Sequence, residues 1–190
     1  MKDQTLLNIT PAYFKSCFPD APSIGLGDDF YIMDATFKEY HNLTSRPCRL
    51  DGFMIFYCVK GNMRMDVNLT EVNLSEGMVY INVPGNIIRL KAVQDTPKEE
   101  YRYACMGLSR EFFQCLNVEI CKLFNEGISM LERPGILLTE RDYELSHSLI
   151  RYIVSLLQSD VAYKREAVLS AMSSFFYILL GAWASESTVM

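Results

Sequence analysis

The sequence predicts an α+β protein in which a β-sandwich or β-barrel comes first and helices follow. Up to Leu108 the apolar residues recur with a period of two between short turns, and from Ser109 they recur with a helical period. Many short strands separated by glycine and proline turns are typical of a sandwich or barrel. We therefore expect a barrel with an N-terminal arm over residues 1–108, and a helical dimerisation region over 109–190 that packs with the barrel as one unit.

The strands are predicted from alternation and from apolar runs. Asn62–Leu69 alternates cleanly between polar residues and Met63, Met65, Val67 and Leu69, which indicates a strand with one buried face. Phe53–Val59 is continuously apolar, as expected of a strand that is covered on both faces. The other expected strands are Phe30–Phe37, Val72–Leu74, Met78–Val83, Ile87–Val93 and Tyr101–Leu108.

Three helices are expected after the strands. Ser109 is a suitable N-cap for a helix over Arg110–Asn125, and Thr139 for a second helix that ends near Ser159. Asp160 can cap a third helix from Val161 to about Ser185, and the short joint before it favours an antiparallel pair.

The last helix contains an uncharged stretch from Ala167 to Ala184. By length this stretch is open to interpretation as a membrane span, but its small and polar residues favour a helix that is buried on most sides. Apolar residues nearly encircle it, which predicts an interface with a second copy, and the alternative is a central core helix. The expected interface residues are Ile150, Val154, Leu157, Met172, Phe176, Leu179 and Trp183.

Charge and motif content exclude several classes of function. The net charge of −5 and the absence of a basic stripe argue against duplex DNA binding by these residues themselves. With two histidines, no Gly-x-Ser-x-Gly and no Cys-x-x-Cys, we expect no enzyme, no metal site and no cofactor. The six cysteines lie mostly in apolar segments and no signal peptide is evident, so we expect reduced thiols and a cytoplasmic protein.

A more specific resemblance comes from the order of strands and turns. It is carried by Phe53–Gly61, Met63–Val67, Leu74–Ile81, Val83-Pro84-Gly85 and the exit Leu108–Phe112. This pattern resembles the sensor domain of AraC-family transcription regulators. The resemblance implies a cupin-like double-stranded β-helix, a jelly-roll barrel, followed by C-terminal antiparallel helices.

The resemblance also places a ligand site in the barrel. Metal-binding cupins hold their ion at positions that correspond here to Cys48, Leu50, Met54 and Ile88, and this set offers no imidazole or carboxylate. A dry lumen that binds a small-molecule effector is the expectation, and the alternative is a lumen filled by its own side chains. The expected lumen residues are Arg49, Met54, Phe56, Cys58, Arg64, Tyr80, Ile88 and Leu90.

The resulting hypothesis is a non-catalytic effector-sensing and dimerisation domain of a bacterial AraC-type regulator. It implies a homodimer through the C-terminal helices, an effector, DNA contact only through a domain beyond these residues, and no membrane. The main alternative is a metal-free cupin that binds a small molecule on its own. A cyclic-nucleotide sensor lacks its phosphate-binding cassette here, and an unusual cupin enzyme would need a metal.

Overall fold

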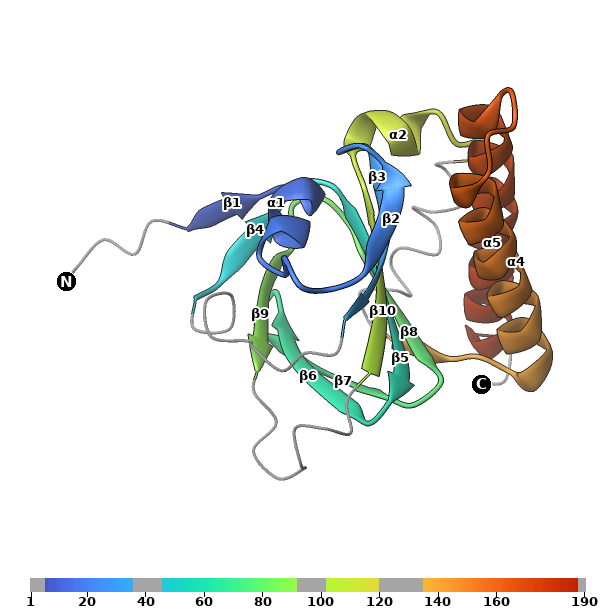
Figure 1. The fold of residues 1–190 in the computed structure, drawn as a ribbon. Helices are drawn as coiled ribbons and strands as arrows, with labels where there is room; N and C mark the ends of the chain where they lie inside the picture. The colour runs from blue at the N-terminus through green and yellow to red at the C-terminus, as the bar shows by residue number, and fades with distance from the viewer. Residues whose placement is uncertain (1–5, 36–45, 92–101, 120–134, 188–190) are drawn as a thin grey trace.

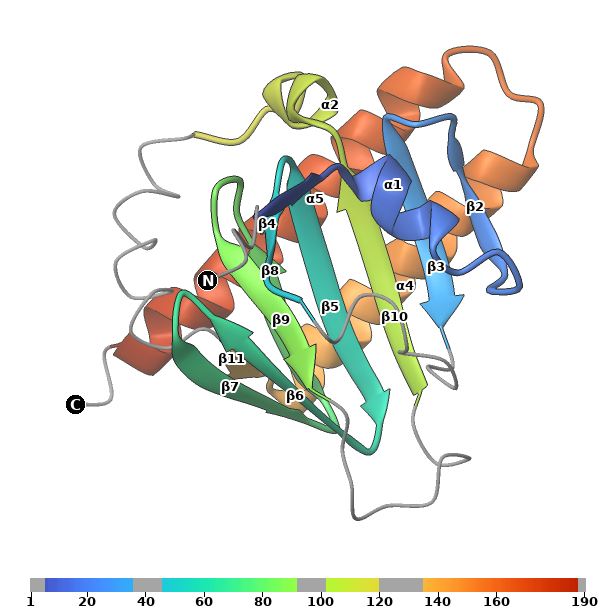
Figure 2. The same ribbon diagram turned by 90° about the vertical axis from the view of Figure 1, so that its left-hand side faces the viewer.

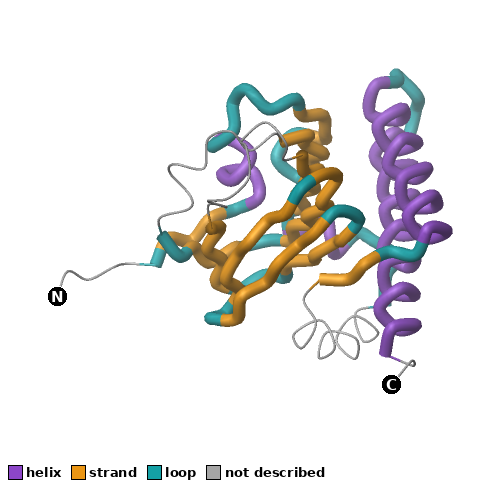
Figure 3. The backbone as a smooth tube through the Cα atoms, turned by 90° about the horizontal axis from the view of Figure 1, so that it is seen from below, coloured by secondary structure: helices purple, strands orange, loops and turns teal. Residues whose placement is uncertain are grey.

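The computed structural model describes residues 6–35, 46–91, 102–119 and 135–187, and in it two β-sheets face each other with a helical layer on one side. The helices α4 (Glu140–Gln158) and α5 (Lys164–Ser187) lie against the outer face of one of the two sheets, which is named sheet B below (Figures 1 and 3). The other sheet, sheet A, lies on the far side of sheet B from the helices. The fold class expected from the sequence, strands first and antiparallel helices after them, is confirmed.

The two sheets contain eleven strands among the described residues. Sheet A has the order β1 (Leu7–Ile9), β4 (Cys48–Leu50), β9 (Ile87–Lys91), β6 (Asn62–Val67) and β7 (Thr70–Ser75). Sheet B has the order β11 (Gly135–Leu137), β8 (Met78–Asn82), β5 (Phe53–Lys60), β10 (Arg102–Leu108), β3 (Phe30–Ala35) and β2 (Ser23–Leu26). Neighbouring strands are antiparallel except β1 and β4 (Figure 2).

Sheet B is buried on both faces, which explains the apolar run in β5. Met54, Phe56 and Cys58 point into the space between the sheets, here called the interior. Ile55 and Tyr57 point to the opposite side and join the core beneath the helices. Alternation by one residue therefore divides one strand between two hydrophobic cores.

The helical layer is an antiparallel pair formed by α4 (Glu140–Gln158) and α5 (Lys164–Ser187). The Thr139 hydroxyl accepts a hydrogen bond from the Asp142 backbone N–H at 3.2 Å and so caps α4. One segment, Lys164–Ser185, is long and apolar enough to cross a membrane by length and composition, and half of its apolar window is buried within the chain. Its most apolar side chains pack on sheet B and α4, as a core helix does.

A polar junction fixes the start of α5 to the rest of the molecule. The Arg165 guanidinium donates to Asp29 at 2.7 Å and lies 5.3 Å from the ring of Phe112 in α2 (Arg110–Gln114). The Ser109 hydroxyl donates to the same carboxylate at 3.3 Å. The β2–β3 turn, the exit from β10 and the helical layer therefore meet at Asp29.

Several expected boundaries differ from the structure. The helix expected over Arg110–Asn125 ends at Gln114, because Cys115 caps it with its own backbone N–H and residues 115–119 leave the helical path. The last helix begins at Lys164 rather than Val161, because Tyr163 has a φ of 59°, which a helix does not accept. Strand β11 places part of the expected helical half in sheet B, and the N-terminal helix α1 (Pro11–Ser16) was not expected.

The β6–β7 hairpin carries an unfavourable turn residue that can be tested. Asn68 and Leu69 have φ values of 48° and 73°, a pair that two-residue hairpins usually fill with Asn-Gly. Leu69 is fully exposed, so its side chain offers no packing in return. We expect Leu69→Gly to raise the free energy of unfolding by about 1 kcal/mol in urea titrations. Leu69→Ala is the control, and an equal gain from alanine would show that the positive φ is not the cause.

Candidate functional site

Six of the eight side chains expected in the lumen come together between the two sheets. All are at most 3% exposed and belong to one cluster. They are Met54, Phe56, Cys58, Tyr80, Ile88 and Leu90. Phe56 and Tyr80, on neighbouring strands, stack with ring centroids 6.2 Å apart.

Arg49 and Arg64, the two expected charged anchors, are exposed and do not lie in the interior. Arg64 lies between the inward-facing Met63 and Met65 in β6, so the pleat turns it outward. Arg49 lies in the same way between Cys48 and Leu50 in β4. The expectation that these arginines anchor a ligand in the lumen is corrected accordingly.

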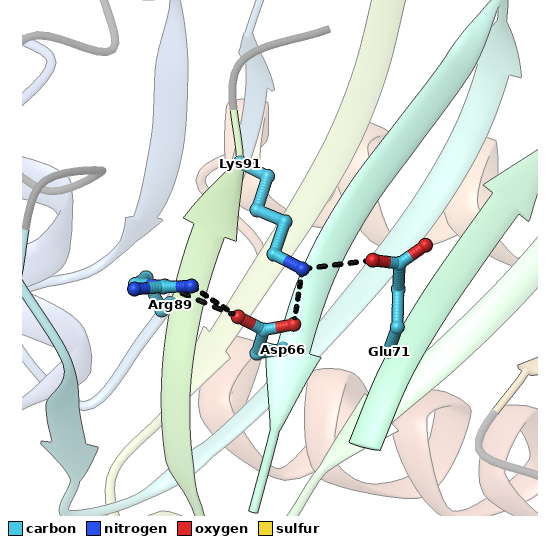
Figure 4. A network of polar contacts seen from close by, with 4 residues as sticks. All are labelled: Asp66, Glu71, Arg89 and Lys91. Atoms are coloured by element: carbon cyan, nitrogen blue, oxygen red, sulfur yellow. Dashed lines mark hydrogen bonds and ion pairs between the residues drawn. The ribbon is translucent and has the colours of Figure 1, made fainter. Parts of the chain in front are cut away.

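The outer face of sheet A carries an ion-pair network instead. Asp66 accepts from Arg89 at 2.8 Å and from Lys91 at 2.6 Å, and Lys91 also donates to Glu71 at 2.8 Å (Figure 4). The hydrogen bond from Lys91 lowers the pKa of Asp66, and Arg89 adds to this effect. These groups are substantially exposed, so the pairs add little stability.

The interior contains further residues that the sequence analysis did not single out. Tyr31, Tyr103 and Cys105 face it from β3 and β10 and are at most 1% exposed. The ring of Tyr31 occupies the space where a Cβ at Gly107 would lie, since that Cβ would come within 2.2 Å of the ring. Period-two alternation in the expected strands Phe30–Phe37 and Tyr101–Leu108 was the signal that could have identified them.

One buried polar pair lies at the side of β8 that faces the interior. The Tyr80 hydroxyl donates to Asn82 Oδ1 at 2.9 Å, and the Asn82 amide donates to the Val83 carbonyl at 3.2 Å. Asn82 is completely buried, and burial raises the pKa of Tyr80. Asn82 is two residues from Tyr80, so the same alternation would have predicted its place.

The N-terminal segment, which we call the arm (residues 6–18), covers one opening of the interior. Thr10 caps α1 and Pro11 fills its first turn, so a short helix forms at this point. Phe14 projects from α1 into the interior, is 1% exposed and meets Phe56 edge-on at 5.9 Å. The Tyr31 hydroxyl donates to the Pro11 carbonyl at 2.9 Å and ties the arm to β3.

The arm also depends on a close approach at Gly52. A Cβ at this position would come within 2.5 Å of Pro11 Cγ. Next to it, the Asp51 backbone N–H donates to the Ile9 carbonyl at 2.7 Å. The pairing of β1 with β4, the Tyr31 hydrogen bond and the buried side chains of Ile9 and Phe14 therefore hold the arm on the barrel.

Among the described residues, the side chains that face the interior pack against one another in one buried cluster. Beneath the arm a pocket remains that has room for about one water molecule. It is lined by Ile9, Phe14, Cys48, Ile88 and Leu90. An effector that binds here therefore has to displace side chains.

The positions that the resemblance aligns with the ligands of metal-binding cupins carry sulfur and hydrocarbon side chains in this interior. Cys48, Leu50, Met54 and Ile88 are all buried, and Cys48 pairs with Ile88 across β4 and β9. Within the described ranges no three histidine, cysteine, aspartate or glutamate side chains group around a common point. This donor set does not fit a metal that prefers oxygen or nitrogen ligands.

The interior thiols are held in their neutral form. Burial raises the pKa of Cys58 to about 12 and raises the pKa of Cys48 and of Cys105. The five cysteines in the described ranges are free thiols, and Cys121 lies outside those ranges. Because the thiolate is the reactive form, these buried thiols should react slowly with alkylating agents.

Most of the expected dimer-interface residues lie inside the chain's own core. Met172, Phe176, Leu179 and Trp183 are at most 2% exposed, and Leu157 is 7% exposed. These five side chains pack on α4, α5 and sheet B and offer no surface to a partner. Ile150 and Val154 are half-buried at the edge of this core.

The role of Phe14 can be tested by truncation. We expect Phe14→Ala to lower the free energy of unfolding by about 3 kcal/mol, since it removes a buried ring. We also expect faster alkylation of Cys48, which lines the pocket next to Phe14, as measured by peptide mass spectrometry. Tyr13→Ala, on the exposed side of α1, is the control and should change stability by less than about 0.5 kcal/mol. An unchanged Cys48 rate would show that Phe14 does not seal this opening.

No protein-family model and no curated protein matches the chain. Solved structures with a similar arrangement include the AraC-like transcriptional activator CuxR, at 9% identity and a TM-score of 0.45. ToxT from Vibrio cholerae, in its apo form, matches at 13% identity and a TM-score of 0.48. A cupin protein from Bacteroides fragilis matches at 11% identity and a TM-score of 0.34.

The extent of these matches differs between the two kinds of structure. The CuxR and ToxT matches each cover 82% of this chain, and 49% and 57% of the matched chains. The chain thus spans about half the length of these two proteins. The match to the Bacteroides fragilis cupin covers 47% of this chain and 76% of that one.

Proposed function

We propose that this chain is the effector-sensing and dimerisation part of a bacterial AraC-type transcription regulator, and that it catalyses no reaction. In this proposal the effector binds in the interior beneath the arm, in the cytoplasm. DNA is contacted by a part of the protein outside these 190 residues. The observation that carries the proposal concerns the two faces of sheet B. One face lines the interior, and the opposite face packs against α4 and α5.

The turns that carry the sequence resemblance support this assignment. Gly61, Gly77 and Gly85 lie in the turns after β5, β7 and β8, and all have φ between 83° and 94°. The pattern therefore corresponds to real reversals between strands of the two facing sheets. Its order along the chain is the order that the AraC-type sensor resemblance implies.

A structural connection between the interior and the helices supports the sensing role. In β5, Phe56 and Cys58 face the interior, while Tyr57 between them faces α4. The rings of Tyr57 and Tyr143 in α4 have centroids 5.8 Å apart. A ligand that moves β5 from the inside therefore moves a residue that α4 contacts directly.

We place the dimer contact on the outer side of α4. Leu145 and Tyr152 are 45% and 53% exposed and are seven residues apart, so they lie on one helical stripe. The exposed Ser148 and the half-buried Leu149 lie between them. Two copies of this stripe can pack antiparallel about a twofold axis, and the half-buried Ile150 can contribute at its edge.

The dimer is tested by charge insertion on this stripe. At tens of micromolar, we expect the unmodified chain to sediment as a dimer. We expect Leu145→Glu with Tyr152→Glu to weaken dimerisation at least about 100-fold, since four apolar side chains leave the contact in each dimer.

The control is Leu69→Glu, which places the same charge at a fully exposed leucine in the β6–β7 turn. It should remain dimeric. A strict monomer for the unmodified chain at high concentration would contradict the dimer, and equal weakening by the control would remove α4 as its location.

A further inference from the structure

The charge content of the interior limits what can bind there. Among the described residues no buried side chain carries a charge, and apart from tyrosine hydroxyls and thiols the buried polar side chains are Asn82, Ser146 and Ser173. Of these three, Asn82 alone faces the interior, since Ser146 and Ser173 belong to α4 and α5. A carboxylate or phosphate in the interior would lose its hydration without gaining a cationic partner among the described residues, which strongly disfavours its binding.

The side chains that fill the interior are unusually adaptable. Met33, Met54, Met63 and Met65 are each at most 1% exposed and belong to this one cluster. Methionine is unbranched and repacks around irregular shapes more readily than leucine or isoleucine. The filled interior can therefore make room for an apolar group by changing methionine rotamers while the sheets stay in place.

Asn82 offers a point in the interior that is suited to a polar atom of a ligand. Asn82 accepts from Tyr80 and donates to the Val83 carbonyl. A primary amide has two N–H groups, so Asn82 can donate to a ligand oxygen and keep the bond to Val83. A sugar has a hydroxyl on nearly every carbon, and most of these groups would stay unpaired in an interior lined mainly by apolar side chains. The Tyr31 and Tyr80 hydroxyls already donate to partners within the chain.

The opening beneath the arm has the same apolar character. The five residues that line the pocket contribute hydrocarbon, a phenyl ring and a thiol. The Phe14 ring is the one group there that comes from the short helix α1 rather than from a strand. Its removal would open a space of the size and polarity of a benzene ring.

We infer that the effector of this chain is an uncharged, mainly apolar molecule with one hydroxyl or carbonyl group, and that its apolar part takes the place of the Phe14 ring. This inference rests on the proposed sensing function and specifies its ligand class. It excludes sugars, carboxylic acids and phosphorylated metabolites as ligands of the interior.

The test uses three probes on the full chain: benzyl alcohol, benzoate at pH 8 and D-glucose. Benzoate has the size of benzyl alcohol but carries a charge, and glucose is uncharged but has many hydroxyl groups. The readout is the alkylation rate of Cys48 by peptide mass spectrometry, supported by the thermal midpoint. At millimolar concentrations we expect benzyl alcohol to slow Cys48 alkylation at least about threefold in Phe14→Ala. The unmodified chain should show the same effect at higher concentration, because Phe14 must first be displaced. Benzoate and glucose should have no effect on either chain.

Two variants make the assignment specific. Phe175→Ala removes an equally buried ring from the helical core, so benzyl alcohol can stabilise it without protecting Cys48. Asn82→Leu should abolish the preference for benzyl alcohol over toluene. If Asn82→Leu does not fold, the comparison of benzyl alcohol with toluene on Phe14→Ala provides the same information.

The outcomes separate this inference from the proposed function. Protection of Cys48 by benzoate or glucose would overturn the ligand class and leave a sensor with a different effector. Protection in Phe14→Ala but not in the unmodified chain would overturn displacement of the Phe14 ring by the ligand. No protection in either chain would also overturn the inference, and dimerisation through α4, measured by sedimentation, would still decide the assembly part of the proposed function.

Discussion

The structure depends on the burial of sheet B on both of its faces. In β5 successive side chains enter different hydrophobic cores, so a shift of strand register by one residue would exchange the two sets. Phe56 would then face the helices and Tyr57 the interior. The register is held by β8 and β10, which pair with β5 along most of its length. Because both cores need the same register, the interior and the helical layer form together.

This shared wall also explains how the arm relates to the rest of the molecule. The arm is attached to sheet A by the pairing of β1 with β4 and to interior residues by side chains: Phe14 contacts Phe56, and Pro11 accepts from Tyr31. None of these contacts is a salt bridge, so the attachment of the α1 part of the arm depends mainly on the packing of the interior. A change in that packing alters the contacts of the arm on one side of sheet B. On the other side it alters the contact between Tyr57 and Tyr143 in α4.

Period-two alternation predicted five of the residues that face the interior, because burial follows parity once a strand is identified: Met54, Phe56, Cys58, Ile88 and Leu90. Tyr80 was assigned to the lumen as a polar anchor, and it also lies there. Arg64 was assigned to the lumen by its chemistry, although its neighbours Met63 and Met65 already placed it on the other face. The three-residue strands β1, β4 and β11 are too short to show any period, and β1 pairs with a partner about forty residues away. The side chains of α5 that were expected at an interface are buried within the chain for a related reason. A helical pattern shows how much of a helix surface is apolar, but not what covers that surface. In this chain α5 is covered by one face of sheet B, whose strands lie in another part of the sequence.

A neutral interior determines how affinity and response are related. Without a charged anchor, binding energy comes mainly from apolar area removed from water, at about 25 cal/mol per Å². The Phe14 ring is already buried there and loses that burial when it is displaced, so the net affinity is a difference between two similar quantities. A ligand no larger than a phenyl ring gains little more than the arm loses, which is why benzyl alcohol should act on the unmodified chain only at high concentration. An effector that moves the arm must therefore bury more apolar surface than Phe14 does, and the methionines of the interior provide the adaptable walls that such a larger ligand requires.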